Sequence, residues 1–252
     1  MDLSFLLFVA VGFVAQIVDG ALGMAYGVTS TSFLLGLGIP FITPAVASAS
    51  VHASEIFTTA VSGLSHLRFG NVDRSLFKRL LIPGVIGGAL GAYVLTAVSG
   101  GLIKPFVALY LMAMGLLILR RAFQKKKETP LATRFVLPLG IIGGFFDAIG
   151  GGGWGPIVTS TLVARGKNPR FAVGSVNLAE FFVTLAESVT FVLTIGQSMA
   201  QLWQVIAGLI LGGVIAAPLA AYVCKKLPTR TLMIGVGCLI ILLSVRTICL
   251  AL

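Results

Sequence analysis

The stretch that decides the fold is residues 135–164, FVLPLGIIGGFFDAIGGGGWGPIVTSTLVA, which lies between Arg134 and the basic segment 165–170. Cytoplasmic loops of membrane proteins carry an excess of Lys and Arg, so both ends of this stretch are expected on the same side of a membrane. An even number of crossings must then separate them, which excludes one long span. The run from Gly150 to Pro156 supplies the break, because glycine is a poor helix former and proline removes a backbone donor. We expect two short arms of about 12 and 10 residues that enter the membrane and return.

The composition places the chain in a lipid bilayer. Of its 252 residues, 57% are hydrophobic and 10% are charged, with a mean hydropathy of +1.04, whereas a soluble domain carries about 25% charged residues. Apolar runs near the roughly 20 residues needed to cross a bilayer recur at 76–98, 171–195, 202–223 and 231–250. The first apolar run has Asp2 where a signal peptide would have a basic residue, so we expect it to be retained as a helix.

The basic residues indicate topology rather than a nucleic-acid surface. Most of the 18 Lys and Arg lie between apolar runs, in segments 68–79, 120–134, 165–170 and 225–230. The positive-inside rule places all four segments in the cytoplasm. The N-terminus and the loop at 40–44 are then outside, and both termini are predicted to be extracytoplasmic in a multi-pass protein of the cell (inner, cytoplasmic) membrane.

The first half of the chain is repeated in the second half. Residues 13–31 align with 141–159 at an offset of 128, which places Asp19 on Asp147, Gly27 on Gly155 and Tyr26 on Trp154. Residues 50–59 align with 175–184 at an offset of 125, and the same offset carries the glycine pair 87–88 onto 212–213. Such internal similarity indicates a duplicated unit.

Together these patterns predict an all-α polytopic membrane protein with two inverted repeats of about five helical segments each. The first hairpin of each repeat is expected to be broken or re-entrant at its Gly-rich loop. We place the first membrane repeat at residues 1–121, a cytoplasmic linker at 122–133 and the second, inverted repeat at 134–252. Five segments per repeat is an odd number, so the second copy starts on the opposite side of the membrane. Inverted repeats with interrupted helices are typical of secondary transporters, whose sites lie near the midplane.

The acid-and-glycine segments resemble those of the TauE/SafE family of sulfite and organosulfonate exporters. The resemblance is carried by DGALGMAYG at 19–27, by DAIGGGGWGP at 147–156 and by the Ser-Val segments that follow them, SVHASEIFTT and SVNLAEFFVT. The first copy departs from the family's fuller glycine cluster, since it has Met24, Ala25 and Tyr26 and no proline. The resemblance implies export of sulfite or a related sulfur-containing anion.

An oxyanion inside a bilayer needs hydrogen-bond donors, and apart from Arg246 no Lys or Arg lies within the expected spans. Backbone amides at a glycine-rich break, next to the positive end of a restarted helix, would supply them. Hydroxyl groups after the breaks would add to these donors, and close helix packing through small residues is the alternative explanation for the glycines. The predicted substrate-binding residues are Gly23, Tyr26, Gly27, Thr31, Gly150, Gly151, Gly152, Gly153, Trp154, Gly155, Thr159, Ser50, Ser175 and Asn177.

Five acids lie at membrane depth, where an ionisable group is costly and is therefore a functional candidate. The residues predicted for proton coupling or gating are Asp19, His52, Glu55, Asp147, Glu180 and Glu187. Hydrogen bonds that tie each hairpin to a neighbouring helix are the structural alternative. His52 and Glu55 share a helical face, but the second copy has Asn177 in place of His52, so we expect no metal site there. No cofactor is expected, and the three cysteines lack the spacing of a zinc site.

The function predicted from these observations is export of a small sulfur-containing anion, sulfite or an organosulfonate, by alternating access at a midplane site. The expected partners are this anion and the lipid bilayer, with a homo-oligomer as an option and no nucleic acid. Import of a related compound such as thiosulfate is the alternative within transport. A membrane scaffold or an intramembrane enzyme is the alternative in another class. No P-loop pattern supports direct use of ATP, and we expect the protein not to be an enzyme.

Overall fold

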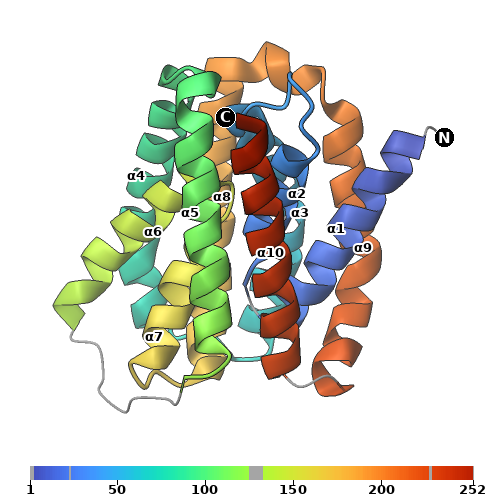
Figure 1. Ribbon diagram of the computed structural model, residues 1–252. Coiled ribbons are helices and arrows are strands. Elements are labelled where there is room, and N and C mark those ends of the chain that lie inside the picture. The colour runs from blue at the N-terminus through green and yellow to red at the C-terminus, as the bar shows by residue number, and fades with distance from the viewer. Residues whose placement is uncertain (1–2, 23, 125–132, 227–228, 252) are drawn as a thin grey trace.

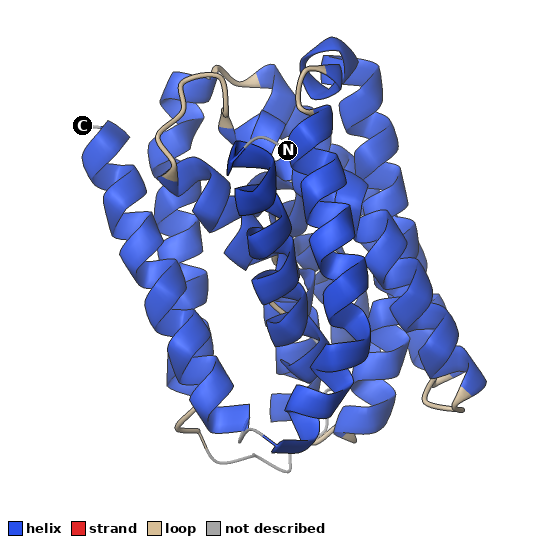
Figure 2. Ribbon diagram, turned by 90° about the vertical axis from the view of Figure 1, so that its right-hand side faces the viewer, coloured by secondary structure: helices blue, strands red, loops and turns tan. Residues whose placement is uncertain are grey.

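A computed structural model describes residues 3–22, 24–124, 133–226 and 229–251. The first half contains five helices: α1 (Leu3–Leu22), α2 (Tyr26–Gly36), α3 (Pro44–Arg68), α4 (Arg74–Ala97) and α5 (Gly100–Arg121). The second half contains η1 (Thr133–Phe135), α6 (Val136–Gly150), η2 (Gly155–Thr159), α7 (Ser160–Ala164), α8 (Pro169–Ala200), α9 (Trp203–Lys226) and α10 (Thr229–Ala251). The prediction of an all-α polytopic protein is confirmed, since the described residues form helices and no strand (Figure 2).

Four of the described helices are long and apolar enough to cross a membrane: Arg74–Ala97, Gly100–Arg121, Arg170–Ala200 and Met233–Leu250. Their outward faces are apolar. Leu102 and Phe106 of α5, Leu193 of α8 and Leu242 of α10 each expose 69–80% of their surface. Such side chains are expected on a surface that contacts lipid, whereas soluble proteins rarely expose large apolar areas.

The two breaks occur where the glycine-rich segments predict them. The second hairpin turns at Gly151 and Gly152, whose φ angles of 63° and 144° lie in a region that side chains disfavour. The following turn, η2, is a π-helical turn that contains Pro156, which has no amide hydrogen to donate. In the first hairpin the left-handed residue is Ala25, with a φ of 91°. A non-glycine residue in this conformation stores strain, which is common at functional sites.

The third segment of each half begins in the same way. The Thr43 side chain accepts a hydrogen bond from the Val46 amide at the start of α3, and Asn168 accepts one from the Arg170 amide at the start of α8. In each helix a proline follows the cap at the first helical position. Proline has no amide hydrogen, and an amide hydrogen at this position would have no partner within the helix. The two caps are separated by the offset of 125 that the repeat predicts.

Glycines allow the first helix of each half to pack on the fourth helix of the other half. Helix α1 lies against α9, and α6 lies against α4. A Cβ on Gly212 of α9 would overlap the Val9 carbonyl of α1, and one on Gly87 of α4 would overlap the Ile141 carbonyl of α6. Small residues at these crossings permit the close backbone approach by which membrane helices associate. Helices α3 and α8 also pack together, as do α5 and α10.

The ends of the helices lie at two faces of the bundle. Figure 1 shows the N- and C-termini at its upper end, and the end of α5, the end of α9 and α7 at its lower end. The described residues of the basic segments predicted to share one side of the membrane lie next to these lower ends. The α1–α2 hairpin enters from the upper end, and the hairpin made by α6 and α7 enters from the lower end (Figure 1).

Candidate functional site

The two breaks meet inside the bundle. A Cβ placed on Gly27 would lie 2.5 Å from the Cα of Gly152, so the two backbones touch directly. The Thr31 hydroxyl of α2 donates a 2.8 Å hydrogen bond to the Gly151 carbonyl. Gly27, Thr31, Gly151 and Gly152 are all buried. The contact thus joins the two halves at a point shielded from the surface of the molecule.

Side chains of the first half satisfy the carbonyl groups around the second break. The Ser48 hydroxyl of α3 donates to the Ala148 carbonyl over 2.5 Å, and His52 Nε2 lies 3.2 Å from the Asp147 carbonyl. The Tyr110 hydroxyl of α5 donates to the Gly152 carbonyl over 3.4 Å. The last carbonyls of a helix have no partner within it, so these contacts stabilise the end of α6 in a dry interior.

The amides at the start of each restarted helix are bound by an aspartate seven residues earlier. Asp147 Oδ1 accepts hydrogen bonds from the amides of Gly153, at 2.5 Å, and Trp154, at 2.8 Å. Asp19 Oδ1 accepts one from the Tyr26 amide at 3.4 Å. The offset of 128 relates the two contacts. A carboxylate of the protein therefore occupies the place that we predicted for a substrate oxyanion.

Four acids surround the point where the breaks meet. A cavity of about 10 Å³ lies there, lined by Asp19, Ala25, Tyr26, Gly27, Val28, Glu55, Asp147, Gly152, Gly153, Gly155, Pro156 and Glu180. This volume is at the lower limit for one water molecule. Of the residues predicted for this region, Tyr26, Gly27, Gly152, Gly153 and Gly155 line the cavity together with all four acids.

His52 joins two further carboxylates across the halves. Its Nε2 faces a backbone carbonyl, which can only accept, so this nitrogen carries a hydrogen. Its Nδ1 lies 3.1 Å from Glu55 Oε2 and 3.2 Å from Glu187 Oε2. If Nδ1 carried no hydrogen and both carboxyl groups were ionised, three hydrogen-bond acceptors would face one another with no donor between them. The group formed by His52, Glu55 and Glu187 therefore holds at least one proton, on the imidazole or on a carboxyl group.

Several predicted residues lie away from the cavity. The Ser175 hydroxyl accepts from the Asp73 amide at 2.8 Å, at the end of the bundle opposite the termini. Ser50 and Asn177 donate to carbonyls of their own helices. The Trp154 indole is fully buried and donates to the Val176 carbonyl at 3.1 Å. Each of the four side chains thus makes a contact within the protein, and its role in substrate binding stays a prediction.

The remaining predicted residues have mixed surroundings. Thr159 is buried, and its hydroxyl has no hydrogen-bond partner among the described residues. Gly150 leaves room for the Tyr110 ring, which a Cβ would overlap. Gly23 lies outside the described residues. No signal in the sequence pointed to Ser48 and Tyr110. Neither is a charged residue within an apolar span, and neither lies in a glycine-rich segment.

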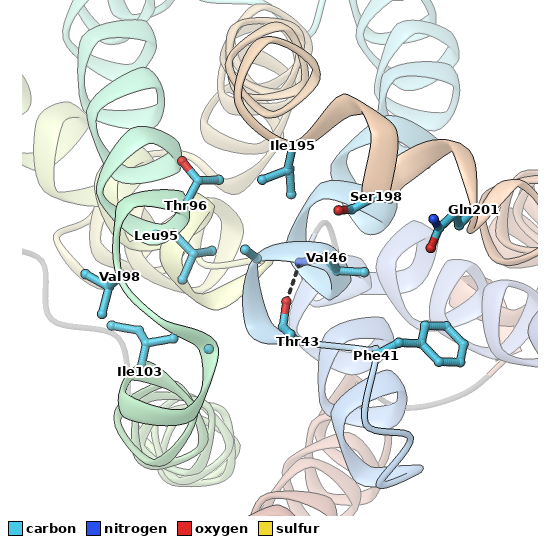
Figure 3. Close-up of a pocket in the computed structure, with 12 residues that line it drawn as sticks. Phe41, Thr43, Val46, Leu95, Thr96, Val98, Ile103, Ile195, Ser198 and Gln201 are labelled. Carbon is cyan, nitrogen blue, oxygen red and sulfur yellow. Dashed lines mark hydrogen bonds between the residues drawn. The ribbon is translucent and has the colours of Figure 1, made fainter.

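A larger cavity of about 300 Å³ opens at the end of the bundle that carries the termini. Figure 3 shows its walls, which come from the start of α3, the end of α4, the start of α5 and the kink of α8 at Ile195. The described residues that line it carry no charge, and their polar groups are those of Thr43, Thr96, Ser198 and Gln201. This cavity is large enough for a small polar solute, and its described lining residues offer that solute no charged side chain.

The opposite end is fastened by polar contacts between the halves. Lys167 Nζ lies 2.8 Å from Asp73 Oδ2, and Arg170 donates to Asn71 and to the Phe69 carbonyl. The hydrogen bond from Lys167 and those from two amides at the start of α4 hold the pKa of Asp73 below its usual value of 3.8. The α3–α4 loop is thereby tied to the start of α8. We refer to the contacts of residues 69–73 with 167–175 as the basic-end clasp.

Comparison with known proteins places these features in a family context. The family model described as "Sulfite exporter TauE/SafE" matches residues 8–247. "Probable membrane transporter protein YtnM" of Bacillus subtilis (strain 168) is 45% identical over 250 residues, which cover 96% of this chain and 82% of that protein. "Probable membrane transporter protein ORF9" of Sinorhizobium sp is 28% identical over 230 residues, which cover 84% of this chain and 80% of that protein. No solved structure gives a significant match.

Proposed function

Since the chain belongs to the sulfite exporter TauE/SafE family and is a multi-pass membrane transporter, we propose that it exports small sulfur-containing anions from the cytoplasm. Sulfite is the substrate that the family's description names, and organosulfonates are the related anions that the resemblance of the sequence implies. The observation that supports a substrate site in this region is the buried contact between the two helix breaks, at Gly27 and Gly152. Transporters built from repeats bind their substrates at such junctions of interrupted helices.

We infer that residues 1–121 and 134–252 are inverted repeats joined by a linker at 122–133. Three features support this relation. The hairpins enter from opposite ends (Figure 1), the helix caps at Thr43 and Asn168 keep the repeat offset, and so do the aspartate contacts at the breaks. By the positive-inside rule, the basic-end clasp faces the cytoplasm and both termini are extracytoplasmic.

Asp147 marks the anion site in this proposal. Its carboxylate accepts from the amides of Gly153 and Trp154, and a sulfite or sulfonate group presents the same kind of oxygen acceptor. The substrate binds when Asp147 releases these amides, which then face the anion at the positive end of the restarted helix. Glycine at 152, 153 and 155 lets the anion approach the backbone closely.

The group formed by His52, Glu55 and Glu187 holds at least one proton, which supports a role for these residues in coupling. They connect α3 of the first half to α8 of the second half, and His52 also holds the Asp147 carbonyl at the break. A proton that leaves this group changes the charge next to the anion site. Rearrangement of the break and loss of the proton are thereby linked in the transport cycle.

Alternating access requires that the two ends open in turn. The uncharged cavity of about 300 Å³ serves as the extracytoplasmic vestibule, and the basic-end clasp closes the cytoplasmic end in the state that the structure presents. Opening of the cytoplasmic end separates the α3–α4 loop from the start of α8. The contacts of Asp73 and Arg170 break in this step.

The proposal is tested by flux into and out of proteoliposomes that contain the purified protein. Sulfite, thiosulfate, a sulfonate and a simple carboxylate are compared at equal concentration. We expect saturable flux of a sulfur-containing anion, with altered substrate affinity in Asp147→Asn and unchanged flux in Cys249→Ser, whose side chain is exposed on α10. Saturable flux of the carboxylate alone would refute the substrate class, and no flux of any anion would favour a scaffold. Flux measured against each gradient distinguishes export from import.

A further inference from the structure

Three side chains that can bind a metal ion converge where α3, α6 and α8 meet. Ligating atoms of His52 on α3, Asp147 on α6 and Glu187 on α8 all lie within 4.8 Å of one another. Each of the three residues exposes at most 2% of its surface. The sequence predicted no metal at the pair His52 and Glu55, whereas this group takes two of its three members from the second half of the chain.

Carboxylate oxygens in this group have no partner. Both oxygens of Glu187 are buried and make no hydrogen bond among the described residues, and the same holds for Asp147 Oδ2. Glu187 Oε2 lies 3.2 Å from His52 Nδ1, so this carboxylate points into the group. Buried acceptors without a donor are costly. A proton between Glu187 and His52 would still leave Asp147 Oδ2 without a partner, whereas one metal ion can accept electron pairs from all three side chains.

The His52 ring is oriented as a metal ligand would be. A ligating histidine usually donates its other ring N–H to a carbonyl or a carboxylate, which fixes the tautomer. His52 Nε2 lies 3.2 Å from the Asp147 carbonyl and donates to it, which leaves Nδ1 as the nitrogen that can ligate. The 3.2 Å between Nδ1 and Glu187 Oε2 is close to the roughly 3.3 Å that separates two atoms bound to one Zn²⁺ ion.

From this geometry we propose that His52, Asp147 and Glu187 bind a divalent metal ion of the Zn²⁺ type. Imidazole nitrogen and carboxylate oxygen are ligands that Zn²⁺ accepts, and three protein ligands are the number found at its open sites. Two carboxylates offset the charge of a divalent ion, whereas a monovalent ion would leave a negative charge in the membrane interior. Metal binding displaces protons from its ligands, so the ion takes the place of the proton that His52 and its acidic neighbours otherwise hold.

The ion would join the two halves of the protein. His52 lies in the first half, and Asp147 and Glu187 lie on two helices of the second half. Asp147 also holds the amides of Gly153 and Trp154 through Oδ1, so a metal on this carboxylate stabilises the second break in the conformation of the structure. This inference goes beyond the proposed function, because it concerns a bound ion and not the transported anion.

The test is equilibrium binding of radioactive Zn²⁺ to the purified full-length protein, first stripped with a chelator and kept free of any transported anion. Cys238→Ser and Cys249→Ser are present throughout to remove the two exposed thiols of the described residues. We expect one saturable site per chain and a melting temperature that rises with Zn²⁺. Glu187→Gln and Asp147→Asn each remove a charged ligand and should weaken binding by at least the 10–100-fold, roughly, that loss of an outer partner costs. Either variant serves if the other does not fold.

Glu180→Gln is the matched control. Glu180 is a half-buried acid that lines the cavity between the breaks but does not belong to the converging group, so Zn²⁺ binding should be unchanged. X-ray absorption of the bound ion should show nitrogen and oxygen ligands at about 2.0–2.1 Å and no sulfur at about 2.3 Å.

Three results would overturn the proposal. These are absence of saturable Zn²⁺ binding, binding that Glu187→Gln and Asp147→Asn leave intact, and a sulfur ligand on the bound ion. Equal weakening by Glu180→Gln would also count against it, because the response would then follow acidic charge in general. Since no anion is present, failure of this test leaves anion transport standing, and failure of anion flux leaves the metal site standing.

Discussion

Substitution of Gly152 by alanine tests whether the two breaks touch. Gly152 has a φ of 144°, and a Cβ there would lie 2.5 Å from the Cα of Gly27 and closer still to the Val28 amide nitrogen. Both obstacles are backbone atoms, which cannot rotate away as a side chain can. The first hairpin must therefore move if the alanine is to fit.

The cost has two parts. Holding an alanine in this backbone conformation costs about 1–3 kcal/mol. Forcing a methyl group into a filled contact costs about 1–3 kcal/mol more. The sum is about 2–6 kcal/mol, which for a chain of this length corresponds to a fall in the melting temperature on the order of 10 °C. Transport should fall as well, because the methyl group separates the two hairpins at the proposed site.

The assay is thermal unfolding of the detergent-solubilised protein, with flux in proteoliposomes as a second measurement. Gly235→Ala in α10 is the control, because a Cβ there meets nothing within 4 Å. Alanine favours a helix over glycine by roughly 1 kcal/mol, so this control should be neutral or slightly stabilised. A Gly152→Ala protein as stable and active as Gly235→Ala would refute the contact between the breaks.

Three further outcomes follow from individual contacts. Asp73→Ala removes the cap of α4 and the partner of Lys167, so it should cost about 1 kcal/mol at pH 7. The pKa of Asp73 in the folded protein lies below 3.8. The difference in unfolding free energy between the wild type and the variant should therefore be largest above pH 3.8 and should disappear as the pH falls through the lowered pKa, as unfolding measured against pH would report. His52→Asn should destabilise by about 3–5 kcal/mol and Glu187→Gln by less, and the double variant should cost less than the sum, which a double-mutant cycle measures. Trp154→Phe should lower stability by about 1 kcal/mol and leave the KM for the anion unchanged, whereas a raised KM would place the indole in the binding site.

The sequence predicted the two breaks correctly because their causes are local. Glycine and proline act on the backbone of their own segment, so the interruptions near Gly150 and Tyr26 follow from composition alone. The shared face of His52 and Glu55 likewise follows from helical periodicity, and their side chains do meet at 3.1 Å. The presence of four acids in one cavity was not predictable, since it depends on how the halves pack.

Ser50 and Ser175 show what a repeat alone cannot predict. They occupy matching positions, so the sequence suggested a shared role. The start of α8 lies beside the end of α3, as the hydrogen bond of Ser175 to Asp73 shows, and the two helices therefore run in opposite directions. Matching residues near the starts of antiparallel helices lie at opposite ends of the bundle. Similarly, Glu187 lies 3.2 Å from His52 Nδ1, although the matching position of the first half is Ser62.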